Sequence, residues 1–161
     1  MSNEGEFTIE LEQTDGYEFK VRFDLDGADD LIMDEPPPLG QGNGPNPSRA
    51  LAAAAAHCLS ASLLYCVTKN TPPSGAITTS ATCRLSRNDS GRLRIGGMSI
   101  RLTVDGSLEE ATRMKRCLNL FEDFCVVTES LREGFPVDVT VSNSAGAKLH
   151  RSKATSLPDE T

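Results

Sequence analysis

The chain has 161 residues, of which 38% are hydrophobic and 24% are charged, and its formal net charge is −7. This length predicts a single domain, because one core usually suffices for chains of up to about 250 residues. The hydrophobic fraction excludes wholesale disorder, and the negative charge disfavours a nucleic-acid binder, which needs basic residues against the phosphate backbone.

Alternation of apolar and polar residues near the N-terminus predicts a β-hairpin with one buried face. The turn is Thr14-Asp15-Gly16. The apolar positions on either side of it are Phe7, Ile9, Leu11, Tyr17, Phe19, Val21 and Phe23. Residues 34–47 are dense in proline and glycine, so an irregular loop is expected there.

A long helix is predicted from Pro47 to about Lys69, with Asn46 as its N-cap. Its residues leave almost no polar face, so we expect it to be surrounded by protein. The apolar run is interrupted by His57 and by serines, so it should fall short of a bilayer span, and no membrane partner is expected. Tyr65 is expected in the core rather than in a substrate site.

A second hairpin is predicted from 77–85 and 93–104, joined by a turn at 88–91. The alternation slips by one position at Gly96-Gly97, which indicates a β-bulge.

A second helix is predicted from Ser107, in a capping box with Glu110, to about Phe124. Its buried stripe is predicted to hold Met114, Cys117, Leu118 and Phe121. The basic cluster at 113–116 is predicted to lie on the solvent-exposed face of this helix. A short helix over 127–132 closed by Gly134, and a strand over 137–141, should follow.

This order of elements predicts an α+β fold. The polar end of the chain is expected to fray, which gives one domain over 1–147 and a flexible tail over 148–161.

The five cysteines are Cys58, Cys66, Cys83, Cys117 and Cys125. Their odd number, without a C-x-x-C pair or a secretory signal, argues against the framework of structural disulfides found in secreted proteins and favours a cytoplasmic location. The two histidines show no zinc-site spacing, so no metal is expected. Any one cysteine reads more readily as a small buried hydrophobe than as a reactive group, and both interpretations stay open.

Two segments resemble the signatures of the OsmC/Ohr superfamily, the osmotically inducible and organic hydroperoxide resistance proteins. The first is Gly44-Pro45-Asn46-Pro47-Ser48 with the alanine-rich run that ends at Cys58. The second, over 121–136, contains Cys125, and the run over 34–40 is similar to a broader OsmC-like branch. The resemblance implies antiparallel sheets packed around two long buried helices in an intertwined homodimer.

The resemblance also implies a thiol peroxidase acting on organic hydroperoxides in oxidative stress. Cys58 would be the peroxidatic cysteine, oxidised to a sulfenic acid, and Cys125 would resolve it to a disulfide. An external dithiol, lipoyl-type or other, would restore the thiols, with no metal, haem or flavin as cofactor. Phe121 and Phe124, which flank Cys125, would wall an apolar peroxide pocket, and Ser48 is expected to line it as well.

Activation of Cys58 needs help, because only about 3% of an unperturbed thiol is ionised at pH 7. The N-terminus of its own helix lies about 16 Å away, beyond the reach of the helix dipole. We therefore expect an arginine from another element. The resemblance implies two candidates: Arg22, on the second predicted strand, for the N-terminal family arginine, and Arg132, which matches the family arginine after the second cysteine.

The chain departs from the family pattern at Ser48, where a glutamate orients the activating arginine in the Ohr-like segment. Glu35, Glu122 or Glu129 could replace that carboxylate. Because of this departure, two alternatives stand beside the peroxidase: a non-catalytic thiol redox sensor or small-ligand binding module, and a structural dimer with inert buried cysteines.

Overall fold

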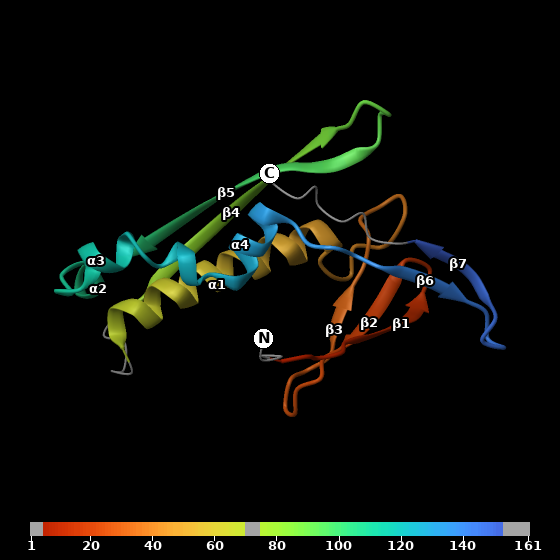
Figure 1. Cartoon of the computed structure of the whole chain (residues 1–161), viewed down its shortest axis with the longest axis horizontal. Helices are drawn as coiled ribbons and strands as arrows, with labels where there is room; N and C mark the ends of the chain where they lie inside the picture. The colour runs from red at the N-terminus through yellow and green to blue at the C-terminus, as the bar shows by residue number, and fades with distance from the viewer. Residues whose placement is uncertain (1–4, 70–74, 153–161) are drawn as a thin grey trace, which may run out of the picture. The chain divides into compact units, whose positions relative to one another are not determined.

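The computed structural model describes residues 5–69 and 75–152 (Figure 1). In chain order the elements are β1 (Glu10–Asp15), β2 (Glu18–Arg22), β3 (Leu31–Met33), α1 (Pro47–Thr68), β4 (Ile77–Arg87), β5 (Leu93–Val104), α2 (Gly106–Glu109), α3 (Met114–Leu118), the 3-10 helix η1 (Glu122–Phe124), α4 (Val126–Glu133), β6 (Val139–Ser142) and β7 (Lys148–Ser152). This mixture of one long helix and small sheets confirms the predicted α+β class.

The described residues fall into two compact units. The first lies within Met1–Ala56 and Thr79–Leu102, and the second lies within His57–Thr78 and Thr103–Thr161. Helix α1 begins in the first unit and ends in the second. The single domain expected over 1–147 stays a prediction.

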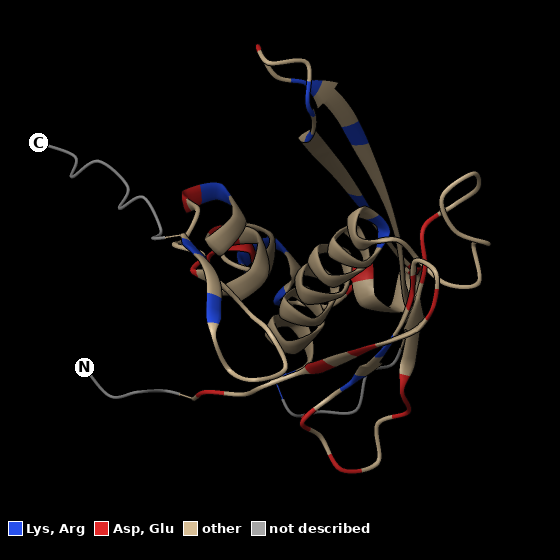
Figure 2. Cartoon of the chain, turned by 90° about the vertical axis from the view of Figure 1, so that its right-hand side faces the viewer, with Lys and Arg blue, Asp and Glu red and all other residues tan. Residues whose placement is uncertain are grey.

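In the first unit, β1, β2 and β3 form an antiparallel sheet in which Val21 pairs with both Leu11 and Leu31. The predicted hairpin is confirmed, with Gly16 in its turn at φ +50°. The predicted buried face is wrong, because Val21 is the only buried residue among the three strands. Residues 5–35 carry eleven acidic against two basic residues, and the acidic colour follows these strands and loops in Figure 2.

The loop before α1 is irregular, as predicted, but it is organised by one buried carboxylate. Asp34 is only 3% exposed, and its oxygens accept hydrogen bonds from the backbone N–H groups of Glu35 (2.8 Å), Gln41 (2.9 Å) and Asn43 (3.1 Å). Burial acts to raise the pKa of Asp34, but these backbone donors outweigh it and lower the pKa below its usual range. A Cβ at Gly40 would lie 2.2 Å from Asp34 Oδ1, so this position admits only glycine without rearrangement.

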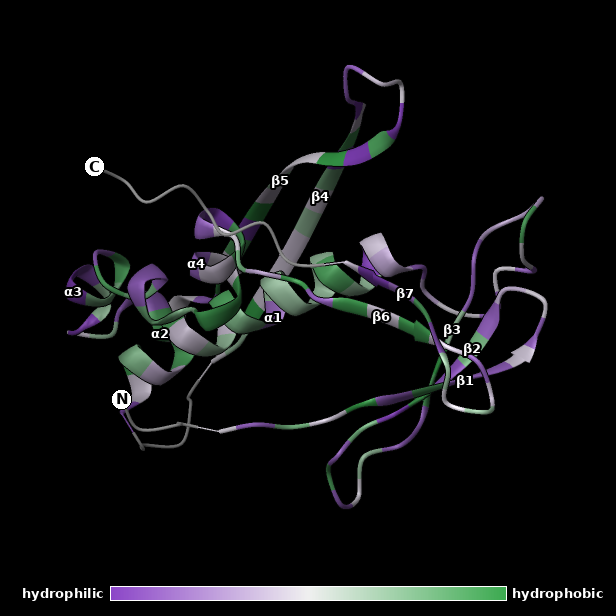
Figure 3. Cartoon of the chain, turned by 45° about the vertical axis from the view of Figure 1, so that its right-hand side comes forward, coloured by the Kyte–Doolittle hydropathy of each residue, from purple (hydrophilic) through white to green (hydrophobic). Residues whose placement is uncertain are grey.

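Helix α1 begins at Pro47, and Asn46 caps it by accepting a hydrogen bond of 3.2 Å from the N–H of Arg49, as the sequence predicts. One face is buried, through Ala52, Ala55, Leu59, Leu63 and Val67. The opposite face is exposed at Ala53, Ala54, His57, Ala61 and Tyr65. The expectation that protein surrounds this helix is therefore wrong for a single chain, because only one face of the helix is buried. Figure 3 shows that α1 is coloured mostly from white to green, on the hydrophobic side of the scale.

By length and composition alone, the 22 residues of α1 could cross a membrane, contrary to the expectation that the apolar run falls short. A core helix passes the same test, so this one helix is weak evidence of a membrane span.

Strands β4 and β5 pair as the predicted second hairpin, with Gly91 at φ +74° in its turn. The side chain of Ser86 packs against Gly96, where an added Cβ would lie 2.8 Å from Ser86 Cβ. Glycine at the predicted bulge thus allows a close approach between the strands.

The predicted second long helix is wrong: the segment forms α2, α3 and η1, three short helices. The N-cap is Asp105 rather than Ser107, because the Asp105 carboxylate accepts hydrogen bonds from Ser107 Oγ (2.8 Å), the N–H of Ala76 (2.8 Å) and the N–H of Leu108 (3.4 Å). Met114 and Cys117 are buried as predicted, whereas Leu118 is exposed.

Helix α4 confirms the predicted short helix, and Gly134 ends it at φ +76°. Strand β6 confirms the predicted last strand, but the chain then continues into β7, which pairs with β6. Fraying from about residue 147 is therefore wrong, because a hairpin orders Lys148–Ser152. The rest of the expected tail lies outside the described residues.

Candidate active site at Cys58

The structure brings Cys58 and Cys125 together although 67 residues separate them. Cys58 lies on α1, Cys125 is the N-cap of α4, and their thiols share a hydrogen bond. Both residues belong to the second unit. Two sulfurs in this relationship can form a disulfide once one of them is oxidised.

The N-terminus of α4 faces the sulfur of Cys58. The extended backbone of Cys125 (φ −83°, ψ 95°) turns the chain from η1 into α4. The N–H groups of Val126 and Val127, which lack helical acceptors in this first turn, hydrogen-bond to Cys58 and favour its thiolate. Sequence reasoning considered only the distant N-terminus of α1, and no local pattern places α4 against α1.

Burial nevertheless dominates the ionisation of Cys58. It raises the pKa of the Cys58 thiol, the hydrogen bond with Cys125 adds to that rise, and the N–H groups of Val127 and Val126 offset only part of it. In the described part of the chain, no arginine or lysine is among the groups that most shift this pKa. The activation by a cation that the sequence analysis requires is therefore missing from these contacts.

Access distinguishes the two cysteines. Cys125 is 0% exposed, and its thiol donates a hydrogen bond of 3.0 Å to Thr128 Oγ1. Cys58 is partly exposed and opens on a cavity of about 720 Å³. The cavity wall is formed by Cys58, Ala61, Ser62, Tyr65, Cys66, Lys69, Arg113, Arg116, Leu120 and Phe124. A small molecule can therefore reach Cys58 before it reaches Cys125.

Of the predicted pocket residues, only Phe124 lines the cavity that contains Cys58. Phe124 lines the Cys58 cavity as expected, and Phe121 is not part of its wall. Tyr65, expected in the core, is 68% exposed and lines the cavity, and Arg113 and Arg116 line it rather than forming only a solvated face. Ser48 lies in the first unit, in a separate hollow of about 610 Å³.

The two candidate arginines are engaged with carboxylates. Arg22, in the first unit, forms an ion pair of 2.8 Å with Glu12. Arg132, in α4, forms an ion pair of 2.5 Å with Glu122 in η1 and another with Glu129 in α4. The guanidinium group of Arg132 therefore links η1 to α4. These carboxylates raise the pKa of Arg132 further above its already high value. The activating roles of Arg22 and Arg132 stay predictions, as does replacement of the family glutamate by Glu35, Glu122 or Glu129.

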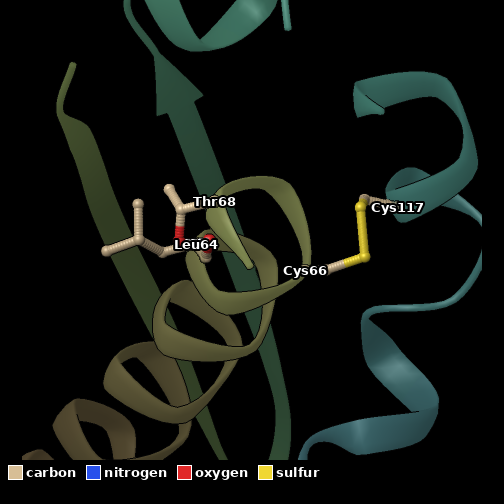
Figure 4. The surroundings of a disulfide bond; sticks show 4 residues. All are labelled: Leu64, Cys66, Thr68 and Cys117. Carbon is tan, nitrogen blue, oxygen red and sulfur yellow. Dashed lines mark hydrogen bonds between the residues drawn. A yellow bond between two sulfur atoms is a disulfide. The ribbon is translucent and has the colours of Figure 1, made fainter. Parts of the chain in front are cut away.

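A disulfide that the sequence analysis did not expect joins Cys66 on α1 to Cys117 on α3, with the Cα atoms 5.7 Å apart (Figure 4). One pair of cysteines is bridged, and Cys58, Cys83 and Cys125 remain free thiols. Cys66 lines the same cavity as Cys58, so the disulfide belongs to the wall of the site. Cytoplasmic location stays a prediction.

Within residues 5–69 and 75–152, no group of three metal-ligating side chains is close enough to hold an ion. The expected absence of a metal or cofactor stays a prediction.

Comparison with known proteins identifies one family. The model described as OsmC-like protein matches residues 40–140. Among curated proteins, none matches the chain.

Solved structures share the fold. The organic hydroperoxide resistance protein OsmC from Legionella pneumophila superposes with a TM-score of 0.61 at 15% identity, covering 81% of this chain and 92% of that one. An organic hydroperoxide resistance protein from Elizabethkingia anophelis gives a TM-score of 0.55 at 20% identity, covering 82% and 91%. OhrB of Bacillus subtilis gives a TM-score of 0.51 at 20% identity, covering 80% and 91%. At these identities the likeness shows the fold.

Proposed function

Because this chain belongs to the OsmC-like protein family, we propose that it is a thiol-dependent peroxidase that reduces organic hydroperoxides through Cys58 and Cys125. One observation carries the proposal: the thiols of Cys58 and Cys125 are hydrogen-bonded neighbours, and Cys58 alone of the two opens on a largely apolar cavity. This arrangement supports Cys58 as the attacking sulfur and Cys125 as the resolving one.

The reaction proceeds in two steps. The Cys58 thiolate attacks the terminal oxygen of the hydroperoxide, the O–O bond breaks, and the alkoxide takes up a proton to leave as an alcohol. Cys58 is then a sulfenic acid. The Cys125 sulfur attacks it, and a water molecule leaves as the disulfide forms. An external dithiol, lipoyl-type or other, reduces this disulfide by exchange and is itself oxidised.

The N–H groups of Val126 and Val127 stabilise the attacking thiolate, but burial keeps its fraction small at neutral pH. The site as it stands therefore favours turnover at alkaline pH. A cation brought by a partner subunit would relieve this limit.

The proposal includes a homodimer, because an apolar face of α1 and several large apolar side chains in and next to the first sheet are exposed in the single chain, among them Leu11 in β1 and Phe7 before it. Burial of such surface is the main driving force of subunit association. Light scattering coupled to size exclusion measures the mass, and a monomer would contradict this part of the proposal.

The test of function is peroxide-dependent consumption of a dithiol by variants of the free cysteines. Cys58→Ser should abolish turnover. Cys125→Ser should react once and leave a Cys58 sulfenic acid that dimedone traps. Cys83→Ser is the matched control and should turn over like the wild type, because Cys83 lies in the first unit. Turnover by Cys58→Ser at the wild-type rate would overturn the proposal.

A thiol redox sensor is the second candidate, because Ser48 stands where the Ohr-like segment has its glutamate, and a single oxidation of the neighbouring free thiols of Cys58 and Cys125 needs no recycling. A sensor oxidises once per chain and is not recycled, so the number of turnovers at excess dithiol distinguishes the two functions.

A further inference from the structure

The two cysteines of the Cys66–Cys117 disulfide differ in their access to solvent. Cys66 is partly exposed and lines the cavity that contains Cys58, whereas Cys117 is 0% exposed. We propose that Cys66 and Cys117 form a second redox centre, which a dithiol reduces through Cys66 and whose state decides whether α3 stays ordered against α1. The effect on turnover that follows from this rests on the proposed function.

The difference in exposure sets the direction of attack. A thiolate of the dithiol enters through the cavity and attacks Sγ of Cys66, the S–S bond breaks, and the Cys117 sulfur leaves as a thiolate that takes up a proton. The second thiol of the reductant then attacks the reductant's own sulfur in the mixed disulfide with Cys66. The reductant leaves as a cyclic disulfide and Cys66 becomes a thiol, so one dithiol is oxidised for each pair that is reduced.

One cavity gives a reductant access to both pairs of cysteines. In the proposed cycle a dithiol has to reduce the Cys58–Cys125 disulfide, and it approaches from the cavity because Cys125 is buried. Cys66 lines the same cavity. Exposed disulfides are more readily reduced than buried ones, so the bond at Cys66 is open to the same reagent.

Little besides this bond holds α3 in place. The helix has five residues, and isolated helices shorter than about 12 residues are marginal in water. Arg113 caps it without a side-chain hydrogen bond, and within the described part of the chain no side chain of α3 forms a hydrogen bond or an ion pair. Apart from the bonded Cys117, only Met114 of this helix is buried. Reduction should therefore shift α3 toward local unfolding.

The order of α3 bears on the reactive cysteines through the chain that follows it. From Cys117 the chain runs through Leu120 and Phe124, which line the cavity, to Cys125 at the start of α4. With the disulfide closed, this segment is tied to α1 at one end. With the disulfide open, that end is free and the cavity wall beside Cys58 is no longer fixed, so turnover should slow.

Hydroperoxide closes the pair again. One thiol of the reduced pair attacks the O–O bond, becomes a sulfenic acid and releases an alcohol. The other thiol condenses with the sulfenic acid, and water leaves as the disulfide forms. The pair is therefore closed when peroxide is in excess and open when the dithiol is in excess.

Limited digestion with trypsin tests this inference without any turnover. Trypsin cleaves after Arg113, Lys115 and Arg116 around α3, and after Lys20 and Arg22 in β2, which serve as the internal reference. The full chain is reduced with dihydrolipoate and desalted without oxygen before digestion. Cleavage around α3 should then accelerate at least about tenfold, more than cleavage in β2, and reoxidation with tert-butyl hydroperoxide should reverse the effect.

Variants assign the response to this pair. Cys58→Ser combined with Cys125→Ser retains the second pair and should respond to dihydrolipoate as the wild type does. Cys66→Ser combined with Cys117→Ser imitates the reduced state and should be cleaved rapidly around α3 with or without dihydrolipoate. Cys83→Ser is the matched control and should digest like the wild type. If the Cys66 and Cys117 double variant does not fold, reversible reduction of the wild type still decides the question.

Three results would each overturn the inference. Dihydrolipoate leaves the Cys66–Cys117 bond intact in the folded chain, or trypsin cleaves around α3 equally fast in both states. In the third, cleavage in β2 accelerates as much as cleavage around α3, which would show a bond needed only for the global fold.

Turnover distinguishes the inference from the proposed function. The rate of hydroperoxide reduction should rise with dihydrolipoate and then fall by about tenfold as the second pair becomes reduced. Cys66→Ser combined with Cys117→Ser should turn over at the lower rate throughout. A rate that only rises to a plateau overturns the control of turnover and leaves the peroxidase standing. No turnover at any concentration, with the trypsin response intact, overturns the peroxidase function alone.

Discussion

The buried thiol of Cys125 donates a hydrogen bond of 3.0 Å to the hydroxyl of Thr128, one turn further along α4. This contact fixes the side chain of Cys125 at the start of the helix, next to Cys58. The sulfur that we propose as the resolving one is thus held in place before any oxidation occurs.

Replacing Thr128 with valine removes this acceptor at nearly constant volume. We expect formation of the Cys58–Cys125 disulfide to slow by about two- to tenfold, the loss that corresponds to one hydrogen bond. The Cys58 sulfenic acid then persists, and more of it should proceed to sulfinic acid in excess peroxide. Mass spectrometry after rapid quenching measures both products. Thr128→Ser keeps the hydroxyl and should behave as the wild type, and an unchanged rate in Thr128→Val would show that the contact does not position the sulfur.

The reactivity of Cys58 should depend on pH in a direction set by its burial. Its pKa is raised, so at any pH below that value a smaller fraction is thiolate than in a free thiol, whose pKa is about 8.5. Alkylation by iodoacetamide, followed by peptide mass spectrometry in the Cys83→Ser background, should therefore accelerate with a midpoint above about 8.5. A midpoint below that value would reveal a cation acting on Cys58 from outside the contacts described, as a partner subunit would provide.

The Cys66–Cys117 disulfide should stabilise the fold. It closes a loop with a sequence separation of 51 residues, and the loss of unfolded-state entropy predicts a contribution of about 4 kcal/mol to the free energy of unfolding. Replacing both cysteines with serine and measuring denaturant unfolding checks this value. Cys83→Ser provides the control for loss of a single sulfur, and a double variant as stable as that control would contradict the prediction.

Arg132 should contribute little to stability and nothing to the ionisation of Cys58. Its ion pairs with Glu122 and Glu129 are about half exposed, and pairs of this kind typically contribute less than about 1 kcal/mol. Arg132→Gln should therefore lower the free energy of unfolding by less than about 1 kcal/mol and leave the alkylation profile of Cys58 unchanged. A shift of that profile to higher pH would restore to Arg132 the activating role that the sequence predicts.

Features set by neighbouring residues were predictable from the sequence. The start of α1 follows from Asn46 and Pro47, and the end of α4 follows from Gly134, because caps and turns depend on side chains within one or two turns. The proximity of Cys58 and Cys125 was also predictable, but only through the resemblance to a family.

Features set by distant contacts were not predictable. Asp105 replaces Ser107 as a cap because it also binds the N–H of Ala76, 29 residues earlier. The N-terminus of α4 reaches Cys58, and Cys66 reaches Cys117, only because separate elements pack together. Local sequence carries no record of such contacts.

The Cys66–Cys117 bond also changes how assays of this protein are read. The resting chain should show three titratable thiols rather than five, and one complete oxidation should leave Cys83 as the last. A reductant strong enough to cleave the structural bond would raise that count while loosening α3, so a recycling dithiol has to be chosen that opens one sulfur bridge and spares the other.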